Sequence, residues 1–128
     1  MKPTKENRKK FDLDLEYGQI REDRIADMLT NKKIEVKSER GMWMKTGNIC
    51  IEYESYGKPS GIMATEADYW VHILANGDKD YCRLIFDTST VKKLAKKYIK
   101  NIKSGGDGNR SRFVLVPLAE LFLKKNIG

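Results

Sequence analysis

The sequence has few of the residues that build disulfide frameworks and structural metal sites. Its 128 residues include two cysteines and one histidine. Cys50 and Cys82 are far apart and form no CxxC pair, and His72 alone could help them hold a metal. A structural zinc site is therefore not expected. We predict two reduced thiols, as in cytosolic proteins.

Long apolar runs are also missing. No run approaches the roughly 18 residues that a membrane-spanning helix requires. The basic start MKPTKENRKK is not followed by the apolar stretch of a secretory signal. We therefore expect no membrane partner and a cytoplasmic location, which would be the host cytoplasm for a viral protein. With 40% apolar and 34% charged residues, the chain has the composition of one folded domain.

Acidic residues are outnumbered, since 18 Asp and Glu oppose 25 Lys and Arg. The basic excess gathers in residues 1–10, which we interpret as a basic arm before a single domain at residues 11–128. It also gathers in residues 91–103, where the pattern VKKLAKKYIKNIK predicts a helix with a lysine stripe. Such a stripe favours a phosphate backbone as partner. A solvated helix face would show the same pattern.

Apolar periodicity and turn residues predict the order of the elements. The expected elements are, in order, a short strand at residues 11–15, a helix at 20–29, strands at 32–39, 48–55, 70–74 and 81–86, a helix at 91–103, a strand at 112–118 and a short helix at 119–125. The pair Asn76 and Gly77 favours a hairpin. The order indicates an α+β fold with an N-terminal helix, a central and mostly antiparallel sheet containing a β-hairpin, and flanking C-terminal helices.

Carboxylates recur within the strands at residues 32–39 and 48–55. We expect these strands to pair as a hairpin that sets Val36 opposite Ile51 on an apolar face. The same register sets Glu35 opposite Glu52, with Lys37 on their face one pleat along. Like charges that face each other destabilise a sheet, and a divalent cation would compensate them.

A third carboxylate lies in the preceding helix. Glu22 falls on the stripe that Ile25 and Leu29 define, so it is expected to extend the buried face. A carboxylate on such a face is costly unless it is paired or bound to a metal. A first turn exposed to water would leave Glu22 as an ordinary surface acid.

These residues resemble the PD-(D/E)xK metal-dependent nuclease superfamily. The helix carries Gly18-x-x-x-Glu22, the next strand carries Glu35-x-Lys37, and a TGN turn, an acidic strand and PSGIMATEADYW follow. This segment is similar to small phage-type endonucleases and to Holliday-junction resolvases. The resemblance covers about residues 11–75, and a weaker similarity is present at FVLVPLAEL. It implies a restriction-endonuclease-like core.

The chain departs from the superfamily pattern at one position. An Asp usually lies on a strand between the acidic helix and the (D/E)xK strand, whereas here only TNKK separates them. Either Glu35 takes the role of that Asp and Glu52 supplies the second carboxylate, or Glu52 replaces the missing acid. Asp12 or Asp14 could also supply it.

The resemblance implies a DNA endonuclease that uses Mg²⁺ or Mn²⁺. Its catalytic residues would be Glu35, Lys37, Glu22 and Glu52, and its metal ligands Glu22, Glu35 and Glu52. Between carboxylates Lys37 should stay protonated, which favours electrostatic stabilisation over general-base work. Branched or structured DNA is one candidate substrate, and the sequence does not choose among branched, flapped, nicked and plain duplex DNA. A non-catalytic nucleic-acid-binding domain on the same scaffold is the alternative, and a structural or host-interaction protein would need no metal.

Further residues are expected to contact nucleic acid. They are Lys45, Asn48, Lys58, Lys92, Lys96 and Lys100. Trp43 could stack on a base or pack onto its own domain. His72, inside an apolar strand, is expected to be a structural histidine. A homodimer would suit two-strand cleavage, as in many small relatives, although no residue identifies an interface.

Overall fold

The computed structural model describes residues 4–127 of the chain, and the chain divides into two compact units. The first unit ends at Lys32 and the second begins at Lys33. The boundary expected after residue 10 falls inside the helix of the first unit.

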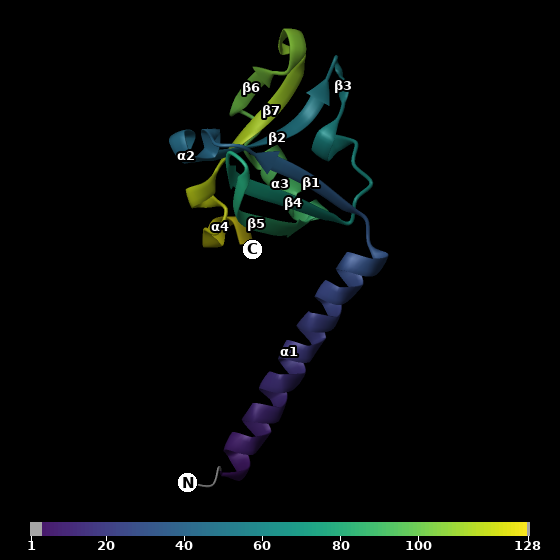
Figure 1. The fold of residues 1–128 in the computed structure, drawn as a ribbon, viewed down its shortest axis with the longest axis vertical. Coiled ribbons are helices and arrows are strands. Elements are labelled where there is room, and N and C mark those ends of the chain that lie inside the picture. Colours follow the sequence, from purple (N-terminus) through teal and green to yellow (C-terminus); the bar gives the residue numbers. More distant parts are fainter. Residues whose placement is uncertain (1–3, 128) are drawn as a thin grey trace. The chain divides into compact units, whose positions relative to one another are not determined.

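The first unit contains the helix α1 (Lys5–Asn31), which is 27 residues long (Figure 1). The Thr4 side chain caps it by accepting a hydrogen bond from the Asn7 N–H at 3.1 Å. The strand expected at residues 11–15 is wrong, because these residues belong to α1. Phe11 and Leu15 lie four residues apart, and five alternating residues are too few to distinguish a strand from a helix. Within residues 4–127, no helix is both long and apolar enough to span a bilayer.

The second unit contains a three-stranded sheet with the order β1-β4-β5 (Figure 1). Its strands are β1 (Ile34–Glu39), β4 (Tyr69–Asn76) and β5 (Lys79–Asp87). β1 runs parallel to β4, and β4 and β5 form an antiparallel hairpin. Gly77 has a φ of +60° at its turn, so the hairpin predicted at Asn76 and Gly77 is confirmed. The central strand β4 is buried on both faces.

A four-stranded antiparallel sheet has the order β3-β2-β7-β6. Its strands are β3 (Lys58–Pro59), β2 (Asn48–Ser55), β7 (Ser111–Pro117) and β6 (Ile102–Gly105). The short helix α2 (Met42–Thr46) connects β1 to β2 and ends at Gly47, whose φ is +71°. This helix redirects the chain, so β2 pairs with β7 and not with β1. The hairpin expected between residues 32–39 and 48–55 is therefore wrong.

One apolar core joins both sheets to the helix α3 (Thr88–Lys97). Helix α3 contributes Val91, Leu94 and Ala95 to this core. The sheets and loops contribute Ile49, Ile51, Ile62, Trp70, Leu74, Val114, Val116 and Leu121. The lysine helix is shorter than expected, since residues 102 and 103 belong to β6.

Short helical segments complete the second unit. They are η1 (Gly61–Met63), η2 (Asp107–Asn109), η3 (Leu118–Glu120) and α4 (Lys124–Ile127). The expected α+β class is confirmed, with an N-terminal helix, mostly antiparallel strands and helices at the C-terminal end.

Candidate functional site

The core-facing side of β1 is charged. Glu35, Lys37 and Glu39 alternate along the strand and are half-buried, whereas Val36 between them is 52% exposed. Their partners in the parallel register with β4 are buried: Trp70, His72 and Leu74. Because paired residues of neighbouring strands share a face of the sheet, the charged side chains extend the face that covers the core. β1 is an edge strand, so this part of the face is open to solvent.

A pocket of about 200 Å³ lies where β1 meets β2. Its lining residues come from β1, β2, β4 and β7: Lys37, Ser38, Glu39, Cys50, Glu52, His72 and Phe113. The pocket thus brings together Lys37 and Glu52, two of the residues expected at an active site, from strands of different sheets. The expected hairpin is not what brings Lys37 and Glu52 together, because β1 and β2 belong to different sheets.

Lys37 lies between an acid and an aromatic ring. Its Nζ is 3.6 Å from Oε1 of Glu35, and both side chains are 39% exposed. The same Nζ lies 5.8 Å from the centroid of the Trp70 ring, where a cation is attracted by the ring face. The ammonium is therefore held beside Glu35 while its side chain also lines the pocket.

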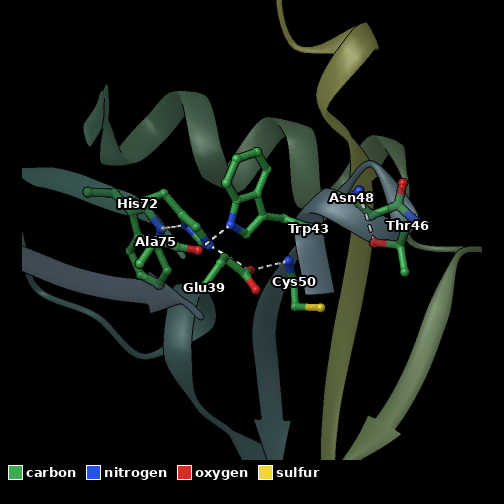
Figure 2. A network of polar contacts seen from close by, with 8 residues as sticks. Glu39, Trp43, Thr46, Asn48, Cys50, His72 and Ala75 are labelled. Carbon is green, nitrogen blue, oxygen red and sulfur yellow. Dashed lines mark hydrogen bonds and ion pairs between the residues drawn. The ribbon is translucent and has the colours of Figure 1, made fainter. Parts of the chain in front are cut away.

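Glu39 connects the two sheets beside the pocket (Figure 2). Its Oε1 accepts a hydrogen bond from the Cys50 N–H at 2.6 Å and lies 3.0 Å from Nε2 of His72. β3 pairs with β2 only at Glu54 and Ser55. Among the described residues, no strand pairs with this edge of β2 at Cys50. The Cys50 backbone N–H therefore donates to the Glu39 carboxylate and not to a carbonyl of a neighbouring strand.

The opposed carboxylate pair expected for Glu35 and Glu52 is wrong, because Glu52 lies opposite Phe113 of β7 and Glu35 beside Trp70 of β4. Alternation with period two holds in both strands, but the faces expected for β1 are reversed, because Val36 is exposed whereas Glu35 and Lys37 lie on the core-facing side. Alternation also does not select a strand's partner. Within residues 4–127, no three His, Cys, Asp or Glu side chains gather closely enough to hold a metal ion.

Glu22 lies in α1, in the first unit, whereas the pocket belongs to the second. Its side chain is exposed, and so are Ile25 and Leu29, at 49% and 66%. The expected burial of this stripe is therefore wrong. Asp12 and Asp14, the other acids considered for the site, are also exposed residues of α1.

The lysines expected to contact nucleic acid are spread over several elements. Lys45 in α2 and Lys58 in β3 lie near opposite ends of the eight-residue strand β2, which is about 25 Å long, since Lys45 precedes that strand and Lys58 pairs with its last residue. Lys92 and Lys96 belong to α3, and Lys100 follows it. All are exposed except Lys92, which is half-buried. None of them lines the pocket between β1 and β2.

Trp43 and Asn48 make local contacts. The indole N–H of Trp43 donates to the Ala75 carbonyl at 2.8 Å (Figure 2). The Trp43 ring also stacks on that of Tyr81, with centroids 5.8 Å apart. Packing onto its own domain is therefore the role that the structure shows for Trp43. The Asn48 N–H donates to the Thr46 hydroxyl at 3.2 Å, as turn residues commonly do.

Sequence reasoning missed Glu39 as a pocket residue. Because Glu39 follows Glu35 and Lys37 at spacing two, extending the same alternation by one step would have found it. His72 is 1% exposed, and both of its ring nitrogens have hydrogen-bond partners, so its expected structural role is confirmed. Cys50 and Cys82 are both free and half-buried.

Cys50 offers a test of the charge in the pocket. Burial raises the pKa of its thiol above the ordinary value of 9.0, the negative charge of Glu39 raises it further, and Lys103 lowers it. Since only the thiolate is nucleophilic, Cys50 should react slowly with iodoacetamide at pH 8. Glu39→Gln should lower that pKa and speed the reaction. Rates are measured in a Cys82→Ser background, and an unchanged rate would contradict a charged Glu39 beside Cys50.

No family model, curated protein or solved structure matches this chain. The nuclease resemblance therefore stays a prediction from the sequence.

Proposed function

We propose that the chain is a metal-dependent nuclease that hydrolyses DNA phosphodiester bonds at the pocket between β1 and β2. The observation that supports this proposal is the meeting of Lys37 and Glu52 in one pocket, with Glu35 at 3.6 Å from the Lys37 ammonium. Glu35 and Lys37 from β1 and Glu52 from β2 form a combination suited to phosphate chemistry.

The oxygen donors present suit a hard divalent cation. Mg²⁺ commonly binds proteins through only one or two carboxylates, and water and substrate phosphates complete its coordination. Glu52 in the pocket and Glu35 beside Lys37 are donors of this kind. A bound Mg²⁺ or Mn²⁺ would supply neutralisation of the phosphate and activation of a water nucleophile.

Lys37 supplies the fixed positive charge of this site. Its ammonium can bind a non-bridging oxygen of the scissile phosphate and stabilise the charge that develops there during the reaction. Glu35 holds the Lys37 side chain in place through their ion pair. The fully buried indole of Trp70 lies on the other side of Lys37, with its ring centroid 5.8 Å from the Lys37 Nζ, and adds a cation–π attraction to that ion pair.

The net charge of +7 supports a polyanionic substrate. DNA, a homodimeric assembly and a cytoplasmic location remain parts of the proposal. One observation favours the alternative of a non-catalytic nucleic-acid-binding domain, because no triad of metal-binding side chains is found among residues 4–127. Binding and cleavage therefore have to be measured separately.

Glu52→Gln tests the proposed function. The purified chain is incubated with plasmid, linear and four-way-junction DNA in Mg²⁺, in Mn²⁺ and in EDTA. We expect cleavage that requires the metal and falls by about 100-fold or more in Glu52→Gln, because the charged oxygen donor is lost while side-chain shape is kept. Bound DNA is measured in parallel and should change little.

Glu54→Gln is the matched control, since it makes the same change on the same strand outside the pocket. It should cut DNA as the unchanged chain does. DNA binding without cleavage in either metal would contradict the proposal and favour the non-catalytic domain.

A further inference from the structure

Helix α1 carries an exposed stripe along its length. The positions of this stripe recur at alternating spacings of four and three residues: Phe11, Leu15, Gly18, Glu22, Ile25 and Leu29. Two helices that pair as a coiled coil have this heptad spacing. The four large apolar residues of the stripe are all exposed in the single chain. We propose that the stripe is the interface of an antiparallel homodimer, in which α1 pairs with α1 of a second copy.

The C-terminal half of the stripe has a hollow that a partner side chain can fill. The hollow has a volume of about 480 Å³ and is lined by Arg21, Glu22, Ile25, Ala26 and Leu29. The last four of these residues occupy positions i, i+3, i+4 and i+7 of the helix. In a coiled coil, four residues of one helix form the hole that receives a side chain of the facing helix, and this set has the required spacing.

One antiparallel register fills the hollow with the partner's own stripe. In this register the partner's Leu15 lies opposite Ile25 and enters the hollow. The partner's Phe11 lies opposite Leu29, and the partner's Gly18 lies opposite Glu22. Because the pairing is symmetric, the partner's hollow receives Leu15 in the same way. Every large apolar residue of the stripe therefore faces another apolar residue.

Charge selects the antiparallel direction. In a parallel pair in register, Glu22 would face the partner's Glu22 inside the interface, where unpaired charges are costly. In the antiparallel pair it faces the partner's Gly18, and a Cβ built at Gly18 would meet no described atom within 4 Å. The Glu22 carboxylate can therefore reach solvent past the glycine. Arg8 and Lys32, at the two ends of the stripe, face a basic residue in either direction and do not discriminate.

The apolar stripe on the opposite side of α1 is shorter. Three apolar residues follow the same spacing there, and charged residues take the next two positions: Leu13, Tyr17, Ile20, Arg24 and Asp27. The Tyr17 ring is also covered, because the Arg21 guanidinium lies 3.1 Å from its centroid. This contact turns Arg21 toward Tyr17 and away from the proposed interface.

The size of the stripe fits a reversible dimer. From Phe11 to Leu29 it is roughly 27 Å long, at about 1.5 Å per residue. If each large apolar side chain covers roughly 100 Å², two copies with their flanking residues bury on the order of 1,000 Å². Specific interfaces begin near this area, so we expect a dissociation constant in the micromolar range.

Sedimentation velocity of the full chain measures the dimer. We expect monomer at low micromolar concentration and dimer at high micromolar concentration. Leu15→Gln should raise the dissociation constant at least about 10-fold, because it places a polar amide in the apolar hollow. Leu13→Gln is the matched control, since both leucines are 57% exposed on the same helix and Leu13 lies off the stripe. It should dimerise like the wild type.

Disulfide cross-linking tests the direction and the register. The background is Cys50→Ser with Cys82→Ser, and oxidised glutathione is the oxidant. Chains carrying Leu15→Cys and chains carrying Ile25→Cys should cross-link to each other when they are mixed. Neither variant should cross-link when it is oxidised alone, because like positions lie far apart in an antiparallel pair.

Each other outcome overturns the inference. A chain that stays monomeric at every concentration would show that no second copy covers the stripe. A dimer that Leu15→Gln does not weaken, or that Leu13→Gln weakens equally, would place the contact elsewhere. Cross-linking of each cysteine variant with itself would show a parallel pair. None of these measurements uses DNA or a metal, so the interface is decided whether or not the proposed nuclease function holds.

Discussion

Lys37→Ala should lower the rate of DNA cleavage by about 10²–10³-fold, while the protein stays folded. The reason for the first effect is that an ammonium aimed at developing phosphate charge in a partly desolvated pocket is worth several kcal/mol, typically about 3–4. The second follows from exposure, because a half-exposed ion pair such as that with Glu35 contributes about 1 kcal/mol or less to stability. Single-turnover cleavage and thermal unfolding measure the two effects.

Lys33→Ala is the control for this prediction. Lys33 also forms an ion pair, with Glu66 at 3.9 Å, but it does not line the pocket between β1 and β2. Both variants lose one positive charge, so any general weakening of DNA binding should affect them equally. Equal cleavage by the two variants would show that Lys37 has no special role in the chemistry.

Gly61→Ala should cause the largest loss of stability, about 2–5 kcal/mol, and should abolish cleavage. Gly61 has a φ of +52°, and a Cβ there would lie 2.1 Å from the carbonyl oxygen of Glu52. The left-handed backbone costs an L-residue about 1–2 kcal/mol, and the clash with backbone adds to it. Relief of that clash requires β2 to shift at Glu52, so the pocket should change with the fold.

Gly77→Ala separates the cost of the left-handed backbone from the cost of the clash with Glu52. Gly77 has a φ of +60° but would place its Cβ in open space, with nothing within 4 Å. The free energy of unfolding of Gly77→Ala should fall only by the cost of the left-handed backbone, about 1–2 kcal/mol. The pocket between β1 and β2 should be unchanged in this variant. Urea unfolding measures both variants, and equal losses would show that the contact with Glu52 carries no cost.

The fold class was accessible from local patterns. Alternation identified β1 and β2, and the Asn76 and Gly77 pair identified the hairpin between β4 and β5. Each of these features depends on a few consecutive residues. The same limit explains the error at residues 11–15, where five alternating positions also satisfied the helix α1.

Strand partners were not accessible in this way. The apolar face of β2, with Ile49 and Ile51, packs into the core with α3, and β2 then pairs with β7. Five residues of α2 between β1 and β2 were enough to take the two strands into different sheets. The choice depends on which arrangement buries the most apolar surface over the whole unit, and no short window of sequence contains that information.

The sequence by itself determined that Glu35, Lys37 and Glu39 share one side of a strand, because a strand's side chains alternate with period two. Only the tertiary structure decided what that side faces: the edge position of β1 opens it to solvent, and the arrival of β2 places Cys50 and Glu52 against it. The physical reason is that alternation is a property of the backbone, whereas the meeting of two sheets results from packing residues that are distant in the chain.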